Sequence, residues 1–247
     1  MTKYEPGVPS WVDLSARDLD GSVRFYHDLF GWETQDQGEE SGHYTIARRQ
    51  GRQVAGLSTL PDGSVPPHWT TYVDVDDVDE TTSRVEAAGG RVLFGPADVM
   101  EAGRMAVYSD PTGAVIAAWQ PGRHLGAELV NEPGAVIWNE LITSDLDRAR
   151  SFYAQVFGWT WSGSDEYAEI QVAGHSVGGV MPRPAEVPED APDYWLVYFD
   201  SDNLESDVER ATSLGATTLF GPAEVPGTGR FAVLADPEGA VFALFAG

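Results

Sequence analysis

Residues 11–32 read WVDLSARDLDGSVRFYHDLFGW, and residues 138–159 read WNELITSDLDRARSFYAQVFGW. Ten of these 22 aligned columns are identical. Further along, residues 94–119, FGPADVMEAGRMAVYSDPTGAVIAAW, align with residues 220–245, FGPAEVPGTGRFAVLADPEGAVFALF, and 15 of the 26 columns agree. Both pairs occur in the same order and at nearly the same separation, so the chain is an internal duplication.

The duplication divides the 247 residues into two halves of domain size. A stretch rich in glycine and proline, PGRHLGAELVNEPG, separates them and is typical of a linker. We therefore predict a first domain at residues 1–120, a linker at 121–134 and a second domain at 135–247.

Each half contains the same succession of patterns twice. Residues 11–16 alternate like a strand, and Asp18 or Asp20 is suited to cap a helix that ends at Gly31. Three strand-like segments follow, and the pattern then begins again with a strand, a helix ended by Gly89 and Gly90, and three more strands. The strand-like segments of the first half are 11–16, 32–36, 43–49, 53–60, 69–75, 91–99, 104–109 and 115–120. The predicted class is α+β, built from β-α-β-β-β units.

Composition excludes several classes of partner and cofactor. The formal charge is −24, from 15 basic and 39 acidic residues, which argues against nucleic acid or an anionic membrane as a partner because both would repel the chain. No apolar run approaches the roughly 20 residues of a membrane span. The absence of cysteine excludes disulfides and thiolate metal sites. The N-terminal residues lack the pattern of a signal peptide, so we expect a cytoplasmic protein.

The motifs DLDGSVRFYHDLFGW, DLDRARSFYAQVFGW and VDDVDETTSRVEAAGGRV, with the DPTGAV and DPEGAV turns, resemble the vicinal oxygen chelate superfamily. That superfamily contains glyoxalase I, bleomycin-resistance proteins and extradiol dioxygenases. Two fused domains that open with WVDL and WNEL look most like a bacterial group of glyoxalase-like proteins or hydroxylases. The resemblance implies that two β-α-β-β-β units in each domain curl into an open barrel, or cup, that binds a ligand.

The resemblance also says where a metal would be held. The metal enzymes of the superfamily use His, Glu or Gln side chains of central strands, and the corresponding residues here are Trp11, Thr70 and Ala117 in the first half and Trp138, Leu196 and Ala243 in the second. These side chains do not make a transition-metal site. We expect no metal of the family type and no other cofactor. The alternative is a metal-dependent glyoxalase or dioxygenase whose ligands have shifted.

Two carboxylates are the predicted catalytic residues. If Trp11 faces the cup, strand alternation places Asp13 and Ser15 on the same face, and Glu140 takes the place of Asp13 in the second half. A carboxyl group in an aromatic cup would be desolvated, which raises its pKa and suits a general acid or base. The alternative is a purely structural carboxylate that accepts hydrogen bonds from the backbone.

The predicted ligand-binding residues are mostly aromatic, because aromatic walls stack on flat apolar ligands. Core packing is the alternative for each of them. Arg104 and Arg230 are at equivalent positions of the repeat, in GRMAV and GRFAV. Each would either bind an anionic group of the ligand or form an ion pair with a surface carboxylate. His68 opens a strand near a cup mouth. The full set is Trp11, Ser15, His68, Tyr72, Arg104, Trp119, Trp138, Tyr198, Arg230 and Phe245.

These patterns predict a protein that binds, and in one version transforms, a small and partly aromatic metabolite or antibiotic. The ligand would be anchored by Asp13 or Glu140. A sequestering protein without turnover, like the bleomycin-resistance proteins, is a further alternative. The second domain can serve as a covalently attached partner of the first, which favours a monomer with a pseudo-two-fold axis over a dimer of the fused chain.

Overall fold

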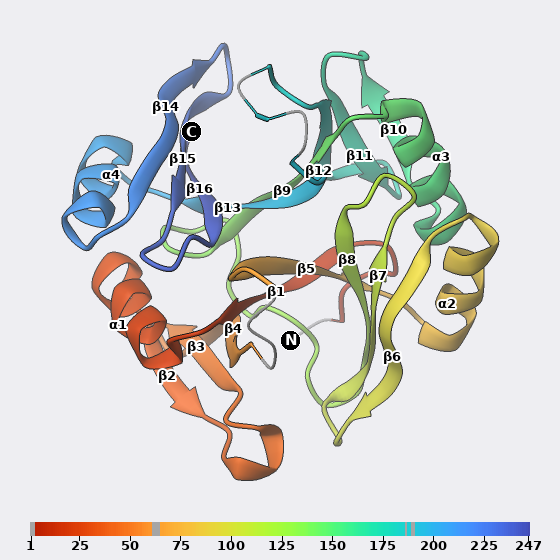
Figure 1. Ribbon diagram of the computed structural model, residues 1–247, viewed down its shortest axis with the longest axis horizontal. Coiled ribbons are helices and arrows are strands. Elements are labelled where there is room, and N and C mark those ends of the chain that lie inside the picture. Colours follow the sequence, from red (N-terminus) through yellow and green to blue (C-terminus); the bar gives the residue numbers. More distant parts are fainter. Residues whose placement is uncertain (1–2, 61–64, 186, 189–190) are drawn as a thin grey trace. The chain divides into compact units, whose positions relative to one another are not determined.

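The computed structural model describes residues 3–60, 65–185, 187–188 and 191–247 (Figure 1). The first half contains β1 (Pro9–Ala16), α1 (Leu19–Phe30), β2 (Glu33–Asp36), a 3-10 turn (Glu39–Ser41), β3 (Thr45–Arg49), β4 (Arg52–Thr59), β5 (His68–Asp74), α2 (Val78–Ala87), β6 (Arg91–Val99), β7 (Gly103–Ser109) and β8 (Val115–Pro121). The second half contains β9 (Val136–Thr143), α3 (Leu146–Phe157), β10 (Thr160–Gly163), β11 (Ala168–Val172), β12 (His175–Pro182), β13 (Tyr194–Asp200), α4 (Leu204–Ser213), β14 (Thr217–Val225), β15 (Gly229–Ala235) and β16 (Val241–Ala246). The predicted α+β class and the β-α-β-β-β units are confirmed.

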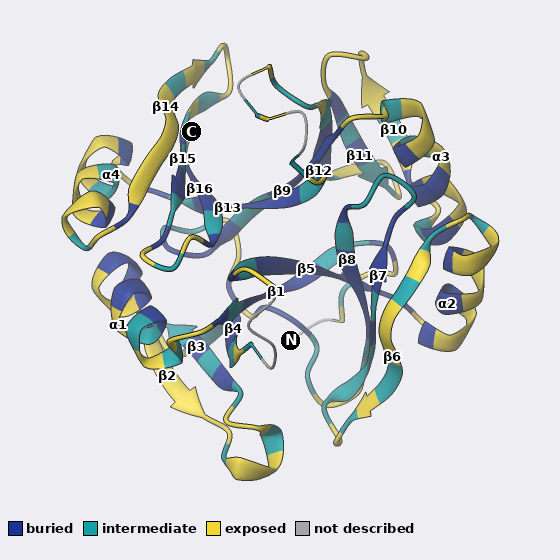
Figure 2. Ribbon diagram, viewed as in Figure 1, coloured by how far each residue is buried: buried dark blue, intermediate teal, exposed yellow. Residues whose placement is uncertain are grey.

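Each half forms one eight-stranded sheet, and the two sheets have the same strand order. The orders are β2-β3-β4-β1-β5-β8-β7-β6 and β10-β11-β12-β9-β13-β16-β15-β14. Neither order closes on itself, so the sheets are not closed barrels. Figure 2 shows buried residues along β1 and β9 and exposed residues along the outer strands β2 and β14. No helix among the described residues is both long and apolar enough to cross a membrane.

Local signals in the sequence set the helix ends. The side chain of Asp18, and not that of Asp20, accepts a hydrogen bond from the Gly21 amide at the start of α1. Gly31 ends the helix with a φ of 70°, a left-handed conformation that glycine adopts without steric cost. The same arrangement recurs in α3, where Asp145 caps and Gly158 terminates the helix. The spacing from the capping aspartate to the FGW sequence is therefore explained by helix length.

The residues also group into two compact units that cross the boundary between the halves. Unit 1 comprises Met1–Ser10, Thr70–Gly126 and Trp138–Trp195, and unit 2 comprises Trp11–Trp69, Ala127–Ile137 and Leu196–Gly247. Each of the two compact units thus contains one β-α-β-β-β segment from each half of the chain. The compact units divide the chain differently from the predicted boundaries at 1–120, 121–134 and 135–247, which stay a prediction.

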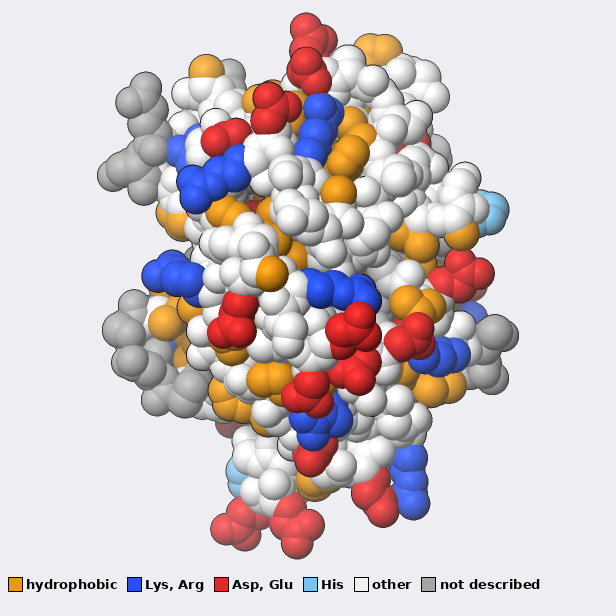
Figure 3. Space-filling model, turned by 90° about the vertical axis from the view of Figure 1, so that its right-hand side faces the viewer, with side chains coloured by type: hydrophobic (Ala, Val, Ile, Leu, Met, Phe, Trp, Pro, Cys, Tyr) orange, Lys and Arg blue, Asp and Glu red, His pale blue; other side chains and the backbone are white. Residues whose placement is uncertain are grey.

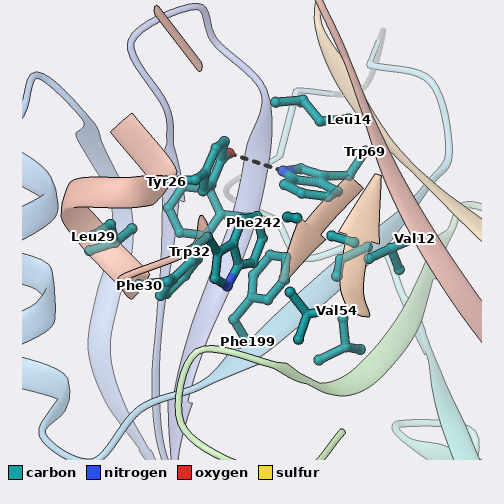
Figure 4. Packing of buried hydrophobic residues seen from close by; sticks show 14 of the residues in the cluster. Val12, Leu14, Tyr26, Leu29, Phe30, Trp32, Val54, Trp69, Phe199 and Phe242 are labelled. Atoms are coloured by element: carbon teal, nitrogen blue, oxygen red, sulfur yellow. Dashed lines mark hydrogen bonds between the residues drawn. The ribbon is translucent and has the colours of Figure 1, made fainter. Parts of the chain in front are cut away.

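The core of unit 2 is centred on Tyr26 of α1 (Figure 4). Its ring stacks on Trp32 at a centroid distance of 5.4 Å and meets Trp69 edge-on at 5.3 Å. The Trp69 indole donates a hydrogen bond to the Tyr26 hydroxyl at 3.1 Å, and that hydroxyl donates to Asp236 Oδ2 at 3.0 Å. Since Asp236 opens the DPEG turn of the second half, this hydrogen bond joins the two halves inside one unit.

Unit 1 repeats the arrangement with the halves exchanged. Tyr153 of α3 donates to Asp110 Oδ2 at 2.9 Å, and the Trp195 indole donates to the Tyr153 hydroxyl at 2.9 Å. The other carboxylate oxygen of Asp110 accepts hydrogen bonds from the backbone amides of the DPTG turn. The tyrosine of the FY sequence in each half therefore donates a buried hydrogen bond to the aspartate of the DPxG turn in the other half.

Candidate functional site

A tryptophan, a tyrosine and a carboxylate form a hydrogen-bonded group in unit 2, which we call the Asp13 triad. Trp11 and Asp13 lie on β1, and Tyr44 directly precedes β3. The Trp11 indole donates a hydrogen bond to the Tyr44 hydroxyl at 2.9 Å, and the Tyr44 hydroxyl is hydrogen-bonded to Asp13. Gly56 lies opposite Asp13 in β4, and a Cβ atom at this glycine would stand 1.8 Å from the tyrosine oxygen. Glycine therefore leaves the space that the phenol occupies.

Unit 1 contains the equivalent group, the Glu140 triad. The Trp138 indole donates a hydrogen bond to the Tyr167 hydroxyl at 3.0 Å, and that hydroxyl is hydrogen-bonded to Glu140. Gly179 of β12 lies opposite Glu140. A Cβ atom there would stand 2.3 Å from the tyrosine oxygen and 2.9 Å from the indole nitrogen. The same four-residue arrangement, with Glu in place of Asp, is thus built twice.

The phenols of both triads act as hydrogen-bond donors to the carboxylates. Burial raises the pKa of Tyr44 well above 10, and the charge of Asp13 raises it further. Burial and then the charge of Glu140 raise the pKa of Tyr167 in the same way. Both hydroxyls therefore keep their protons near neutral pH. A carboxylate that accepts a hydrogen bond from a phenol has further lone pairs with which to accept one from a ligand.

The two triads differ in how far they are open. Asp13 and Glu140 are both buried, with 7% and 6% of their surface exposed. Trp11 is buried as well, whereas Trp138 is only half-buried and Tyr167 is 38% exposed. An aromatic ligand can therefore reach the indole and phenol of the Glu140 triad more directly than those of the Asp13 triad.

The tyrosines of the triads were not predicted from the sequence. Tyr44 and Tyr167 both stand immediately before the third strand of their half, in the sequences YTIA and YAEI. This equivalence between the halves is the signal that could have identified them. The predicted strand alternation does hold, because Val12 and Leu14 lie in the hydrophobic core while Trp11 and Asp13 do not.

Aromatic side chains form a ladder on β13 to β16 of unit 2. Tyr198 lies 6.1 Å from Phe231, which lies 5.6 Å from Phe220, measured between ring centroids. Phe231 is also the register partner of Phe245. Two of these rings, Tyr198 and Phe245, were predicted, and the other two were missed. Phe220 is 44% exposed, so the ladder runs from a buried ring to one that meets solvent.

The corresponding positions of unit 1 carry Tyr72 and Trp119, which are both buried. The Trp119 indole donates a hydrogen bond to the His124 carbonyl at 3.0 Å. A Cβ atom at Gly103 would stand 2.6 Å from the Trp119 ring, so the indole lies across this glycine of β7. This ring is held by contacts within the unit.

The polar residues predicted to bind ligand have partners within the chain. Arg104 pairs with Asp98 at 2.7 Å and Asp79 at 3.0 Å, and Arg230 pairs with Glu205. Figure 3 shows a face on which acidic side chains alternate with arginine and lysine side chains in this manner. Two further predicted residues are half-buried: Ser15, opposite Ser58, and His68, with Nδ1 2.9 Å from the Pro66 carbonyl oxygen. Ligand binding by these four residues stays a prediction.

The residues at the expected metal positions do not fit a divalent ion. The Trp11 indole nitrogen is committed to Tyr44, and Ala117, Leu196 and Ala243 are buried apolar side chains. Within the described ranges, no three His, Asp or Glu side chains gather in a way that could hold a metal.

Comparison with known proteins identifies relatives over the whole chain. The profile of the Glyoxalase/Bleomycin resistance protein/Dioxygenase superfamily matches residues 9–118, and that of the Glyoxalase-like domain matches residues 135–245. "Putative glyoxylase CFP32" of Mycobacterium tuberculosis (strain CDC 1551 / Oshkosh) is 40% identical over 98% of this chain and 96% of its own length. "Anthracycline biosynthesis protein DnrV" of Streptomyces peucetius is 36% identical over 99% of this chain and 94% of its own length.

Solved structures show the same fold at low sequence identity. The Mn(II)-bound glyoxalase from Novosphingobium aromaticivorans superposes with a TM-score of 0.67 at 18% identity, covering all of this chain and 83% of the other. The 2,3-dioxygenase LapB from Pseudomonas sp. KL28 gives a TM-score of 0.69 at 12% identity, covering all of this chain and 94% of the other. At these identities the likeness establishes the fold alone.

Proposed function

The chain belongs to the glyoxalase/bleomycin resistance protein/dioxygenase superfamily, and from that premise we propose that it binds a small, flat, partly aromatic metabolite or antibiotic at the Glu140 triad. The observation that carries this proposal is a buried carboxylate, held by a phenol, beside an indole that is only half-buried. The relative DnrV supports the ligand class, since it is named for the biosynthesis of anthracyclines, which contain a flat aromatic ring system.

Each residue of the triad has a distinct role in this proposal. The Trp138 ring stacks on the ligand, and Glu140 accepts a hydrogen bond from a ligand hydroxyl or takes its proton. Tyr167 donates its hydroxyl hydrogen to Glu140 and so fixes the direction of the carboxylate. We propose that binding needs no metal of the family type, because the side chains at the metal positions are unsuited to one.

Sequestration and turnover are distinguished by analysis of the bound compound. Incubation of the protein with a hydroxylated anthraquinone, followed by chromatography of the extracted ligand, separates the two. A new product that requires Glu140 supports acid–base catalysis, and an unchanged compound that stays tightly bound supports sequestration. Light scattering after size exclusion tests the further proposal that the chain is a monomer.

Replacement of Trp138 by leucine is expected to weaken binding of the anthraquinone by roughly tenfold, because the stacking surface is lost. The measurement is a titration followed through the absorbance of the ligand itself. Trp161→Leu is the matched control, since Trp161 is a half-buried tryptophan of the same unit outside the triad. Equal affinities of the Trp138 variant and the unchanged protein would exclude this ring from the site.

A further inference from the structure

Asp74, the last residue of β5, has a carboxyl group without a donor. Its side chain has no exposed surface, and neither oxygen has a hydrogen-bond partner among the described residues. The Lys3 ammonium lies 4.0 Å from Asp74 Oδ1, but its hydrogen bond goes to Asp76 at 3.0 Å. A buried carboxyl that lacks donors is costly, and such exceptions in a folded protein call for a physical reason.

The duplicated counterpart, Asp200 at the end of β13, shows that this cost is not imposed by the fold. Asp200 Oδ1 accepts a hydrogen bond from the Ser201 amide at 3.0 Å, and the residue is half-buried. The backbone groups of both aspartates are bonded alike: Asp74 pairs with Gly7 and Val8, and Asp200 with Gly134 and Ala135. The two copies therefore differ at the side chain.

The position of Asp74 in the sheet places it beside aromatic residues. Strand alternation puts its side chain on the same face of β5 as Tyr72, and Val73 between them lies in the hydrophobic core. Asp74 is the register partner of Trp119 in β8. Tyr4 lies close enough that the charge of Asp74, after burial, raises the tyrosine pKa to about 12. The acceptor thus shares its part of the sheet with aromatic residues.

We propose that Asp74 is the acceptor of a binding site for a primary ammonium group carried on an aromatic ligand. The position next to its carboxylate already tolerates a cation, because the Lys3 ammonium lies there without a hydrogen bond to it. An ammonium group supplies the charged N–H donors that both oxygens of this carboxylate lack. Lys3 is about half exposed, so an entering amine can displace it. This inference goes beyond the proposed function and does not depend on the Glu140 triad.

The site should bind amines more tightly as the pH rises. Burial raises the pKa of Asp74 to about 7, the charge of Lys3 lowers it, and the charge of Asp76 raises it. Tyr4 is the other titratable group nearby, and it stays protonated up to a pH of about 12. Below pH 7 the neutral acid attracts a cation weakly, and above pH 7 the carboxylate attracts it fully.

A calorimetric titration of the protein with benzylammonium at pH 8 tests the site. Asp74→Asn is expected to weaken binding at least tenfold, and the matched variant Asp200→Asn to change it less than twofold. Lys3→Met, which removes the tethered competitor, is expected to strengthen binding. Equal affinities for the unchanged protein and Asp74→Asn, or no saturable binding even with Lys3→Met, would overturn the proposal. Loss with Glu140→Gln instead would place the amine at the triad and also overturn it.

Urea unfolding is a second measurement, which tests whether the Asp74→Asn variant is folded and whether the Asp74 carboxyl group is buried in the unchanged protein. The pKa of about 7 in the folded state lies above the ordinary value of 3.8, so the folded state holds the proton more tightly. The stability contributed by this proton is present below pH 4 and is lost as the pH rises through 7. Urea unfolding at pH 4.5 and 8 should show that Asp74→Asn removes at most about a two-hundredfold part of the pH-dependent change in the unfolding constant. Identical pH profiles for both proteins would contradict the buried acid.

Discussion

Replacement of Asp110 by alanine is expected to lower the free energy of unfolding by about 3 to 4 kcal/mol. Asp110 is buried, and its two carboxylate oxygens accept hydrogen bonds from different donors. Oδ1 accepts hydrogen bonds from the amides of Thr112, Gly113 and Ala114, and Oδ2 accepts one from the Tyr153 hydroxyl. Alanine leaves these donors without an acceptor, and the phenol is fully buried, so the desolvation cost is not recovered. Urea denaturation measures the effect.

Two further variants distinguish the stability contributed by the DPxG turn from that contributed by the hydrogen bond between tyrosine and aspartate. Tyr153→Phe removes only the hydroxyl and should cost about 1 to 2 kcal/mol. Asp236→Ala, the equivalent change in unit 2, should act as Asp110→Ala does, since Asp236 accepts from Tyr26 and from its own turn. A loss below about 1 kcal/mol for both aspartate variants would show that this buried contact does not stabilise the pairing of the two halves within each unit.

Glu140→Gln is expected to weaken the binding of a hydroxylated anthraquinone at least tenfold, which is about 1.4 kcal/mol. The change preserves shape but removes the charge, and hydrogen bonds to a charged acceptor are stronger than those to a neutral amide. The glutamine also presents an amide group to the Tyr167 hydroxyl, so the side chain is no longer fixed in one direction. Titration through the ligand absorbance at constant pH gives the ratio of dissociation constants.

Asp13→Asn provides the matched control for this prediction. It makes the same chemical change in the Asp13 triad, whose tryptophan is buried. We expect a change of less than about threefold there. If the Asp13 variant loses affinity and the Glu140 variant does not, the functional triad has been assigned to the wrong half. If neither changes, the carboxylates are structural.

The repeat and its elements were predictable because they depend on local signals. The capping aspartate, the terminating Gly31 and the alternation along β1 act within a few residues, and they placed Trp11 and Asp13 on the face away from the core. The role of Tyr44 was not predictable in this way. It depends on the register that sets Gly56 opposite Asp13, and a register between strands is not encoded in either strand alone.

For a related reason, the sequence could not predict that each compact unit combines segments from both halves. Each half carries both an FY pair and a DPxG turn, so the sequence permits Tyr26 to bond to Asp110 or to Asp236 with equal chemistry. The structure pairs Tyr26 with Asp236 and Tyr153 with Asp110. Duplication itself creates this ambiguity, because both partners have the same motif.

We propose that a carboxylate fixed by a phenol, and not a metal ion, holds the ligand. Anthraquinone binding before and after exhaustive dialysis against EDTA, with metal content measured on the same samples, tests it most directly. We predict dissociation constants that agree within about twofold. Loss of binding with the chelator, and its recovery on adding a divalent ion at one equivalent per site, would contradict the claim.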